Sequence, residues 1–226
     1  MAILNFQKPD KIVLQKANDF DAQFEFRPLE PGYGLTIGNA LRRVLLSSLE
    51  GYAIVGIKIE GAEHEFATLK GITEDVTEII LNLKQVRFKK GVDNEVNSEK
   101  ITLTIKNQTE FTAAMIGEAT QAFEVMNPGL LICTMDNSAK LDIEITIAKG
   151  RGYVPAEDNK VKDSVFGYIP IDSIHTPIKN VKYSIENTRV EQRTDFEKLL
   201  MDVTTDGTIH PEEAVKQASR ILFSTS

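Results

Sequence analysis

One segment, residues 29–51, constrains the fold of this chain more than any other. It opens with Pro31 and Gly32, a turn pair in which proline presets φ and glycine accepts conformations that side chains forbid. The pattern then predicts a helix of about four turns over Thr36–Leu49, followed by Gly51, a residue typical of helix C-terminal caps. On a helical wheel one face forms the core stripe expected of a packed helix: Ile37, Ala40, Leu41, Val44, Leu45 and Ser48.

The opposite face of this helix is polar except for Leu46, which lies among Asn39, Arg42 and Arg43. A single exposed leucine is common on protein surfaces. A leucine between arginines, however, is typical of interface centres rather than of ordinary surface. This face therefore predicts a partner, and a protein in particular.

The composition allows a sizeable core and argues against nucleic-acid binding. At 226 residues the chain is long enough for one large domain or two small ones. Its formal net charge is −7, and acidic and basic residues are interspersed. Proteins that bind DNA or RNA usually gather lysine and arginine on one face, because phosphate neutralisation supplies much of the affinity. We therefore expect little or no direct DNA binding by this chain.

The sequence indicates a cytoplasmic protein that does not enter the membrane. No apolar run approaches the length that crosses a bilayer, and Met1 to Phe6 lacks the pattern of a signal peptide. The single cysteine, Cys133, lies in an apolar stretch, which predicts a buried thiol and suits a reducing compartment.

Hydrophobic periodicity along the rest of the chain predicts short strands and two more helices. The alternating segments typical of half-buried strands are 12–28, 55–60, 101–105, 143–147, 181–185 and 199–203. One helix is expected after Thr73 as its N-cap, and another from Pro211, with His210 as a weak cap. Strands mixed with three helices, without regular βαβ alternation, predict an α+β fold. The apolar stripe of the last helix packs either on the core of its own domain or on another copy of the chain.

The sequence contains only a near match to one motif of ligand-binding proteins. Gly32, Gly34 and Gly38 have nearly the spacing of a dinucleotide-binding turn, but the third glycine comes one residue late and Pro31 interrupts any preceding strand. We interpret this segment as a structural turn, with small-ligand binding as the alternative.

Three histidines, His64, His175 and His210, are scattered along the chain. His64 lies between Glu63 and Glu65, which could suggest a metal site, but no partner at ligand spacing is near it. We therefore expect no metal site and interpret the histidines as solvated residues at strand ends. We expect no catalytic residue and no cofactor. An enzyme with carboxylates drawn from distant positions is the remaining alternative.

Residues 149–155 form a second candidate contact region. Two glycines flank Arg151, and Tyr153 and a proline follow, so a permissive backbone displays two residue types that interfaces favour. The alternative is an ordinary loop after the strand at 143–147.

Five segments resemble, in family order, the N-terminal domain of the bacterial RNA polymerase α subunit. They are Leu29–Gly51, Glu74–Lys84, Gly150–Pro155, Arg189–Asp195 and Asp206–Ala214. The resemblance implies a discontinuous dimerisation subdomain, a sheet plus two helices, of residues 1–50 and 177–226. A mostly β subdomain of residues 51–176 is inserted in it. Family members usually continue into a C-terminal DNA-binding domain, which is not expected in a chain that stops at Ser226.

The resemblance also implies a role for each surface. Members of the family form homodimers through the helices at Thr36 and Pro211, and the dimer is a non-catalytic scaffold for the large subunits β and β′. By match of position, β docking is expected at Arg42, Arg43 and Leu46.

Two further sets of residues follow from the same match. Docking of β or β′ is expected on the helix after Thr73, at Glu78 and Lys84, with Lys84 chiefly towards β′. The dimer interface is expected at Ile37, Leu41, Val44, Leu45, Val215, Ala218, Ile221 and Leu222.

Overall fold

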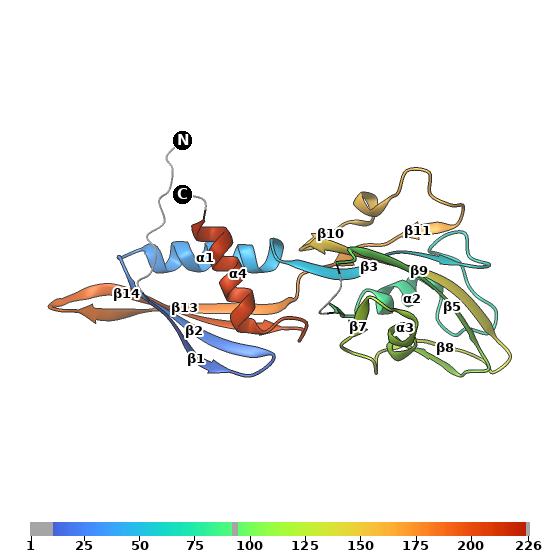
Figure 1. Cartoon of the computed structure of the whole chain (residues 1–226), viewed down its shortest axis with the longest axis horizontal. Coiled ribbons are helices and arrows are strands. Elements are labelled where there is room, and N and C mark those ends of the chain that lie inside the picture. The colour runs from blue at the N-terminus through green and yellow to red at the C-terminus, as the bar shows by residue number, and fades with distance from the viewer. Residues whose placement is uncertain (1–10, 92–94, 225–226) are drawn as a thin grey trace. The chain divides into compact units, whose positions relative to one another are not determined.

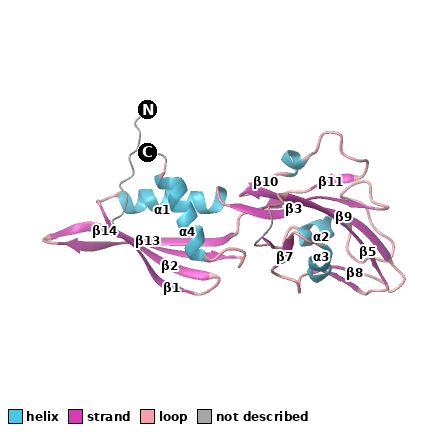
Figure 2. Ribbon diagram, in the orientation of Figure 1, coloured by secondary structure: helices cyan, strands magenta, loops and turns pink. Residues whose placement is uncertain are grey.

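The computed structural model describes residues 11–91 and 95–224, so the expectation for Met1 to Phe6 lies outside the described residues. The described residues form a mixed α+β fold of four α-helices and mostly antiparallel sheets (Figures 1 and 2). They group into two compact units: unit 1 contains the residues up to Leu49 and from Thr176 onward, and unit 2 contains residues 50–175. Among the described helices, none has the length and apolar character needed to cross a membrane.

Unit 1 contains a four-stranded antiparallel sheet in the order β1-β2-β14-β13. Its strands are β1 (Lys11–Ala17), β2 (Asp21–Leu29), β13 (Ile178–Val190) and β14 (Arg193–Thr205). The prediction of one strand over 12–28 is wrong, because Asn18 reverses the chain within it. The Asn18 Oδ1 accepts hydrogen bonds from the backbone N–H groups of Phe20 and Asp21, at 2.8 and 2.7 Å, as asparagine commonly does in turns.

Two helices, α1 (Tyr33–Ser47) and α4 (Pro211–Phe223), pack on this sheet (Figure 1). Both helices are predicted, although α1 begins and ends earlier than its pattern suggests. His210 caps α4, because its ring Nδ1 accepts the Glu212 N–H at 3.1 Å. The shared core consists chiefly of Phe24, Phe26, Leu199 and Met201 from the sheet and Ile37, Leu41, Leu45, Ala214, Val215 and Ala218 from the helices.

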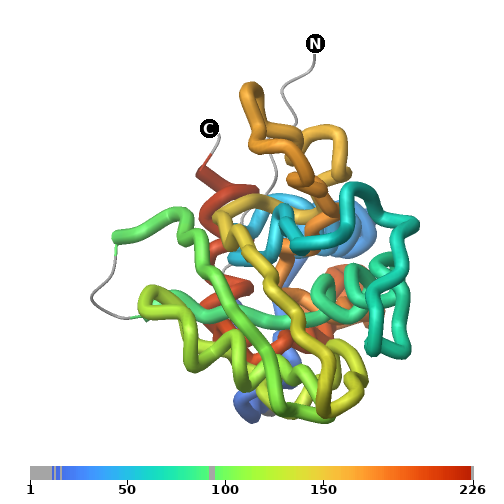
Figure 3. The backbone as a smooth tube through the Cα atoms, turned by 90° about the vertical axis from the view of Figure 1, so that its right-hand side faces the viewer, coloured from blue at the N-terminus to red at the C-terminus, as the bar shows by residue number. Residues whose placement is uncertain are grey.

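Unit 2 is built on a larger sheet in which β5, β9, β3, β4 and β7 follow one another and β11 pairs with β3. Its strands are β3 (Glu50–Ile59), β4 (Phe88–Lys90), β5 (Ser98–Lys106), β7 (Phe123–Val125), β9 (Lys140–Arg151) and β11 (Tyr168–Pro170). The long strands β5 and β9 run side by side (Figure 3). Smaller elements are β6 (Glu110–Thr112) paired with β8 (Leu131–Thr134), β10 (Tyr153–Val154) paired with β12 (Ser173–Ile174), and a short 3-10 helix at Ala156–Asn159.

Helix α2 (Val76–Leu83) is predicted, but its N-cap is Asp75 and not Thr73. Glu74 explains the difference. Its carboxylate accepts hydrogen bonds from the Thr134 backbone N–H at 2.7 Å and hydroxyl at 3.1 Å. Glu74 is thereby held against β8, so the helix starts after it.

Helix α3 (Ala113–Ala119) is missed by the sequence pattern, because only Ala113 and Ile116 of its seven residues are buried. The prediction for Cys133 is confirmed: the residue is buried in the same core. Burial raises the pKa of its thiol to about 12, and the nearby Glu74 carboxylate adds to the rise.

Two glycines of unit 2 lie against His175, Gly51 against its backbone and Gly150 against its ring. Gly51, expected to cap α1, lies instead in β3 opposite Gly150 of β9. A Cβ on Gly51 would lie 1.7 Å from the His175 carbonyl oxygen, and one on Gly150 would lie 2.7 Å from the His175 ring. Both positions therefore require glycine. The expectation of a solvated histidine is wrong here, because His175 is only 3% exposed.

Candidate interaction surfaces

The outer face of α1 carries the residues expected to dock β. Arg43 is exposed, whereas Leu46 is half-buried and packs against the core of unit 1. The Arg42 Nε donates a hydrogen bond to the Val181 carbonyl oxygen of β13 at 3.3 Å. Both arginines are helical neighbours of Leu46, three and four residues before it. Arg43 is the cleaner probe of this face, since truncating Leu46 would also disturb the core.

Glycine serves packing within α1, whereas Gly32 before the helix has a positive φ of 88° and a Cβ there would meet no neighbour. A Cβ on Gly38 would lie 2.8 Å from the Tyr183 ring of β13, so glycine lets the helix approach the sheet. The Gly32 N–H donates to the Glu197 carboxylate of β14. A phosphate at this turn would meet that carboxylate, so the geometry favours a structural turn over a phosphate-binding one.

The two residues expected on α2 already have partners within unit 2. The Glu78 carboxylate accepts the Asp75 N–H at 3.3 Å, while the Asp75 carboxylate accepts the Glu78 N–H at 2.9 Å, which is a capping box. The Lys84 Nζ lies 3.6 Å from an Asp172 carboxylate oxygen. Glu78 itself is exposed.

Asp172, which no sequence pattern marks, joins Lys84 to Tyr153 of the candidate loop. Its carboxylate accepts the Ala156 backbone N–H at 2.7 Å. That bond, with further contributions from the Tyr153 hydroxyl and Lys84, holds the pKa of Asp172 below its usual range. No motif marks this aspartate, because only the fold brings it to the end of α2.

The other predicted loop residue, Arg151, belongs to a surface ion cluster. Its Nη2 lies 2.8 Å from a carboxylate oxygen of Glu50, its register partner on β3. The Lys149 Nζ is 3.6 Å from the other oxygen of the same carboxylate. Tyr153 is 58% exposed and the Arg151 side chain equally so, and both predicted contacts are therefore accessible.

The eight residues expected at the dimer interface differ in exposure. Ile37, Leu41, Leu45, Val215 and Ala218 are buried within unit 1, Val44 and Leu222 are half-buried, and Ile221 is 39% exposed.

Unit 1 also exposes apolar residues outside the set expected at the dimer interface. Leu35 on α1 is 55% exposed. Ile12 and Leu14 of β1 line an apolar groove of about 320 Å³ beside α4, together with Phe24 and Val215. Leu35 is missed because the predicted helix begins after it.

Ser173 and His175 form a pair that resembles part of a nucleophilic site. The Ser173 Oγ lies 2.7 Å from His175 Nε2, and His175 Nδ1 lies 3.1 Å from the Gly51 carbonyl oxygen. Since a carbonyl only accepts, Nδ1 carries the proton and the serine hydroxyl donates to Nε2. Ser173 and His175 are 1% and 3% exposed. The pair is therefore inaccessible to a substrate. Its hydrogen bonds instead join the segment of Ser173 and His175 to the backbone of β3 at Gly51.

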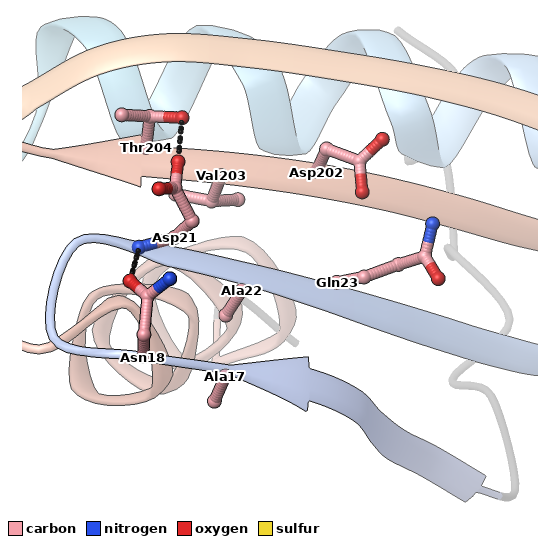
Figure 4. A pocket seen from close by; sticks show the side chains of 8 residues that line it. All are labelled: Ala17, Asn18, Asp21, Ala22, Gln23, Asp202, Val203 and Thr204. Atoms are coloured by element: carbon pink, nitrogen blue, oxygen red, sulfur yellow. Dashed lines mark hydrogen bonds between the residues drawn. The ribbon is translucent and has the colours of Figure 1, made fainter.

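A shallow pocket of about 460 Å³ lies at the β1–β2 turn of unit 1 (Figure 4). The Thr204 hydroxyl donates to the Asp21 carboxylate at 2.6 Å, and Asp202 is the other acidic residue of the lining. Across the described part of the chain, no three His, Cys, Asp or Glu side chains are grouped to hold a metal ion. The polar groups of this pocket mainly serve the turn.

Comparison with known proteins decides the family. A family model described as the RNA polymerase Rpb3/RpoA insert domain matches residues 57–176. Over 223 residues, 99% of this chain and 67% of each relative, the sequence is 64% identical to the DNA-directed RNA polymerase subunit alpha of Cytophaga hutchinsonii and 60% identical to that of Bacteroides fragilis. The chain belongs to the DNA-directed RNA polymerase α-subunit family. The corresponding subunit of Chloroherpeton thalassium is 50% identical over 222 residues, 97% of this chain and 67% of the relative.

Membership of the α-subunit family confirms the resemblance of the five segments. It makes the chain a subunit of a DNA-directed RNA polymerase, acting in transcription. The residues expected to dock β and β′ and to form a dimer stay predictions.

Proposed function

We propose that this α-family chain is a non-catalytic scaffold of RNA polymerase. It forms a homodimer in the cytoplasm and docks the large subunits β and β′, without an active site or cofactor of its own. The outer face of α1 carries the proposal: exposed Arg43 adjoins Leu46, and arginine beside apolar surface is typical of interface anchors.

The apolar surface of unit 1 supports dimerisation. Leu35, Ile221 and the groove at Ile12 and Leu14 expose apolar side chains on α1, α4 and β1. Obligate dimer interfaces commonly bury about 2,000 Å² or more and are as apolar as a domain core. The five residues of the predicted dimer interface that are buried within unit 1 would then form the core on which this exposed apolar surface packs.

The charge of the chain supports a role in which other parts of the polymerase bind the DNA. A net charge of −7 offers little counterion release to drive binding to a duplex. We therefore expect negligible affinity for promoter DNA at physiological salt.

Light scattering after size-exclusion chromatography tests the proposal. The chain alone is expected to elute with the mass of a dimer at micromolar concentration, then to co-elute with purified β, and finally with β and β′ together. A monomer at micromolar concentration contradicts the dimer, and failure of β and β′ to co-elute contradicts the scaffold.

A further inference from the structure

Strand β5 is the last strand of the unit 2 sheet, and one of its two edges is unpaired. On one side all nine of its residues pair with β9, from Ser98 with Ala148 to Lys106 with Lys140. On the other side no described strand pairs with β5. The backbone groups of residues 100–106 form hydrogen bonds with no described segment other than β9. A long free edge of this kind is a template for pairing with another chain.

A groove runs along this free edge, and α3 forms its other wall. Two adjoining hollows, of about 550 and 350 Å³, share Thr102 of β5 and Ala119 of α3 in their linings. The position of α3 is fixed, because Ala113 and Ile116 are buried in the core and the Ala113 N–H donates to the Leu130 carbonyl oxygen at 2.9 Å. The groove is therefore built into the fold of unit 2.

The start of β5 limits the length of the groove. The Glu99 carboxylate accepts hydrogen bonds from the backbone N–H groups of Gln121 and Ala122, at 3.2 and 2.9 Å, which joins this end of the strand to the chain after α3. Residues 100–106 continue beyond this contact as the free edge. At the rise of an antiparallel strand they span about 20 Å, so the edge has room for one extended segment of about seven residues.

The side chains of the groove define what kind of segment fits. Along β5 the side chains of Ile101, Leu103 and Ile105 are buried, and the residues between them are exposed. Met115 and Ala119 of α3 line the groove and pack partly against the same core. An added strand continues the alternation of the sheet. Its inward side chains should therefore be apolar and its outward ones polar.

The charges of the groove place an acidic residue on the outward face of such a segment. Lys106 is exposed and lies opposite Lys140 in register. The Lys140 Nζ is 3.5 Å from an Asp142 carboxylate oxygen, whereas Lys106 has no ion pair among the described residues. Like charges directly opposite each other destabilise a sheet, and a carboxylate beside Lys106 would relieve the repulsion. Glu118 of α3, also in the lining, disfavours a second carboxylate on the inward face.

We propose that the free edge of β5 binds an extended segment of an accessory protein by strand addition. The segment alternates apolar and polar residues and carries an acidic residue opposite Lys106. Since antiparallel pairing is the more stable arrangement, this residue lies near the N-terminal end of the segment. None of the residues expected to dock β or β′ or to form the dimer lines the groove. The inference therefore goes beyond the proposed scaffold function and does not depend on it.

Synthetic peptides test strand addition directly. The probe is a blocked seven-residue peptide that alternates threonine with valine, with glutamate in place of its first threonine. Two further peptides carry N-methyl groups on one or the other alternate set of backbone nitrogens. Alternate residues of a strand direct their N–H groups to opposite edges. One methylated peptide should therefore bind like the parent and the other at least about tenfold more weakly, because it loses several hydrogen bonds. Fluorescence anisotropy measures the affinities for the wild-type chain.

Variants of the groove test the side-chain contacts. Lys106→Glu should weaken binding of the glutamate peptide about threefold or more and strengthen binding of a peptide with lysine at that position. Lys162→Glu, which changes another exposed lysine of unit 2, should alter neither affinity. Met115→Glu should weaken both peptides, because it places a carboxylate against their apolar side chains. Circular dichroism melting checks that the variants are folded.

Four outcomes overturn the inference. The first is no binding of the parent peptide at millimolar concentration, and the second is equal affinity of the two methylated peptides. The third is loss of peptide binding when β and β′ are added to the chain, because the groove would then belong to the large subunits. The fourth is a lower mass of the folded Lys106→Glu or Met115→Glu chain in light scattering, because a second copy would then occupy the groove.

Discussion

Single residues in this chain have roles that depend on neighbours far away in sequence. Gly51 and Gly150 face each other on β3 and β9, and the space that they leave is filled by His175. A glycine after a helix-like pattern suggests a helix cap, as Gly51 does. Its true role depends on His175, more than a hundred residues later, and a single sequence gives no sign of that contact.

The buried His175 makes the stability of the folded chain depend on pH. Burial, together with the charge of Arg87, lowers the pKa of His175 below the usual 6.5, against the opposing effect of the hydrogen bond to Gly51. The folded state therefore favours the neutral ring. Below about pH 6.5, this residue binds more protons in the unfolded chain than in the folded chain. Stability contributed by this residue is present above that pH and is lost as the pH falls towards the lower pKa of the folded state.

We expect His175→Gln to flatten this pH dependence. Glutamine does not titrate, so the variant should lose less stability than the wild type between about pH 7 and about pH 5.5. At about pH 7 it should be less stable by about 1–3 kcal/mol, because Ser173 and Gly51 lose well-placed partners. Urea unfolding at the two pH values measures both effects. Equal losses of stability on acidification in wild type and variant would show that other groups control the acid response.

At the scale of elements, the sequence predicts best those helices and strands that have strong hydrophobic periodicity. The stripes of α1 and α4 and the alternation of β5, β9, β13 and β14 all correspond to observed elements. Errors arise where side chains compete with the pattern. Asn18 divides one alternating run into two strands, and Glu74 delays the start of α2 by bonding to β8. The candidate site is predicted less well, since the contacts of Lys84 and Tyr153 with Asp172 exist only in the folded chain.

The outer face of α1 leads to a prediction for β binding. Arg43→Ala should leave folding and dimerisation intact, because Arg43 is exposed and projects from the core stripe. It should weaken binding of β by about 2–4 kcal/mol, the cost of truncating an interface hot spot. Titration of β into the wild-type and variant dimers measures the difference. Lys160→Ala serves as the control, since Lys160 is an exposed cation whose nearest acidic partner, Glu157, is also on the surface. An equal effect of both substitutions would mean that only net charge matters.

At the scale of the whole molecule, the dimer is expected to depend on the exposed end of α4. Ile221 is 39% exposed in the single chain, so Ile221→Asp should be tolerated by the fold of unit 1. In a dimer the same side chain would become buried, and an unpaired carboxylate there is costly. Light scattering should therefore show a folded monomer or aggregates. A variant that remains fully dimeric at micromolar concentration would remove Ile221 from the interface.

Symmetry gives the sharpest expectation for the assembled polymerase. A two-fold dimer presents every surface twice, yet β and β′ differ and each must find one place on it. The outer face of α1 should thus matter on one protomer and be largely idle on the other. In a dimer that combines one wild-type protomer with one Arg43→Ala protomer, a single intact Arg43 should suffice, and β should dock on the intact protomer. Differently tagged protomers allow such mixed dimers to be purified, and crosslinking from each tag to β reports which protomer it contacts. Mixed dimers should assemble nearly as well as wild type and dimers of two variant protomers poorly. If dimers with Arg43→Ala on both protomers assemble normally, the docking role of this helix face is wrong; if mixed dimers fail as completely as double-variant ones, both copies of the face are needed and the asymmetric scaffold is wrong.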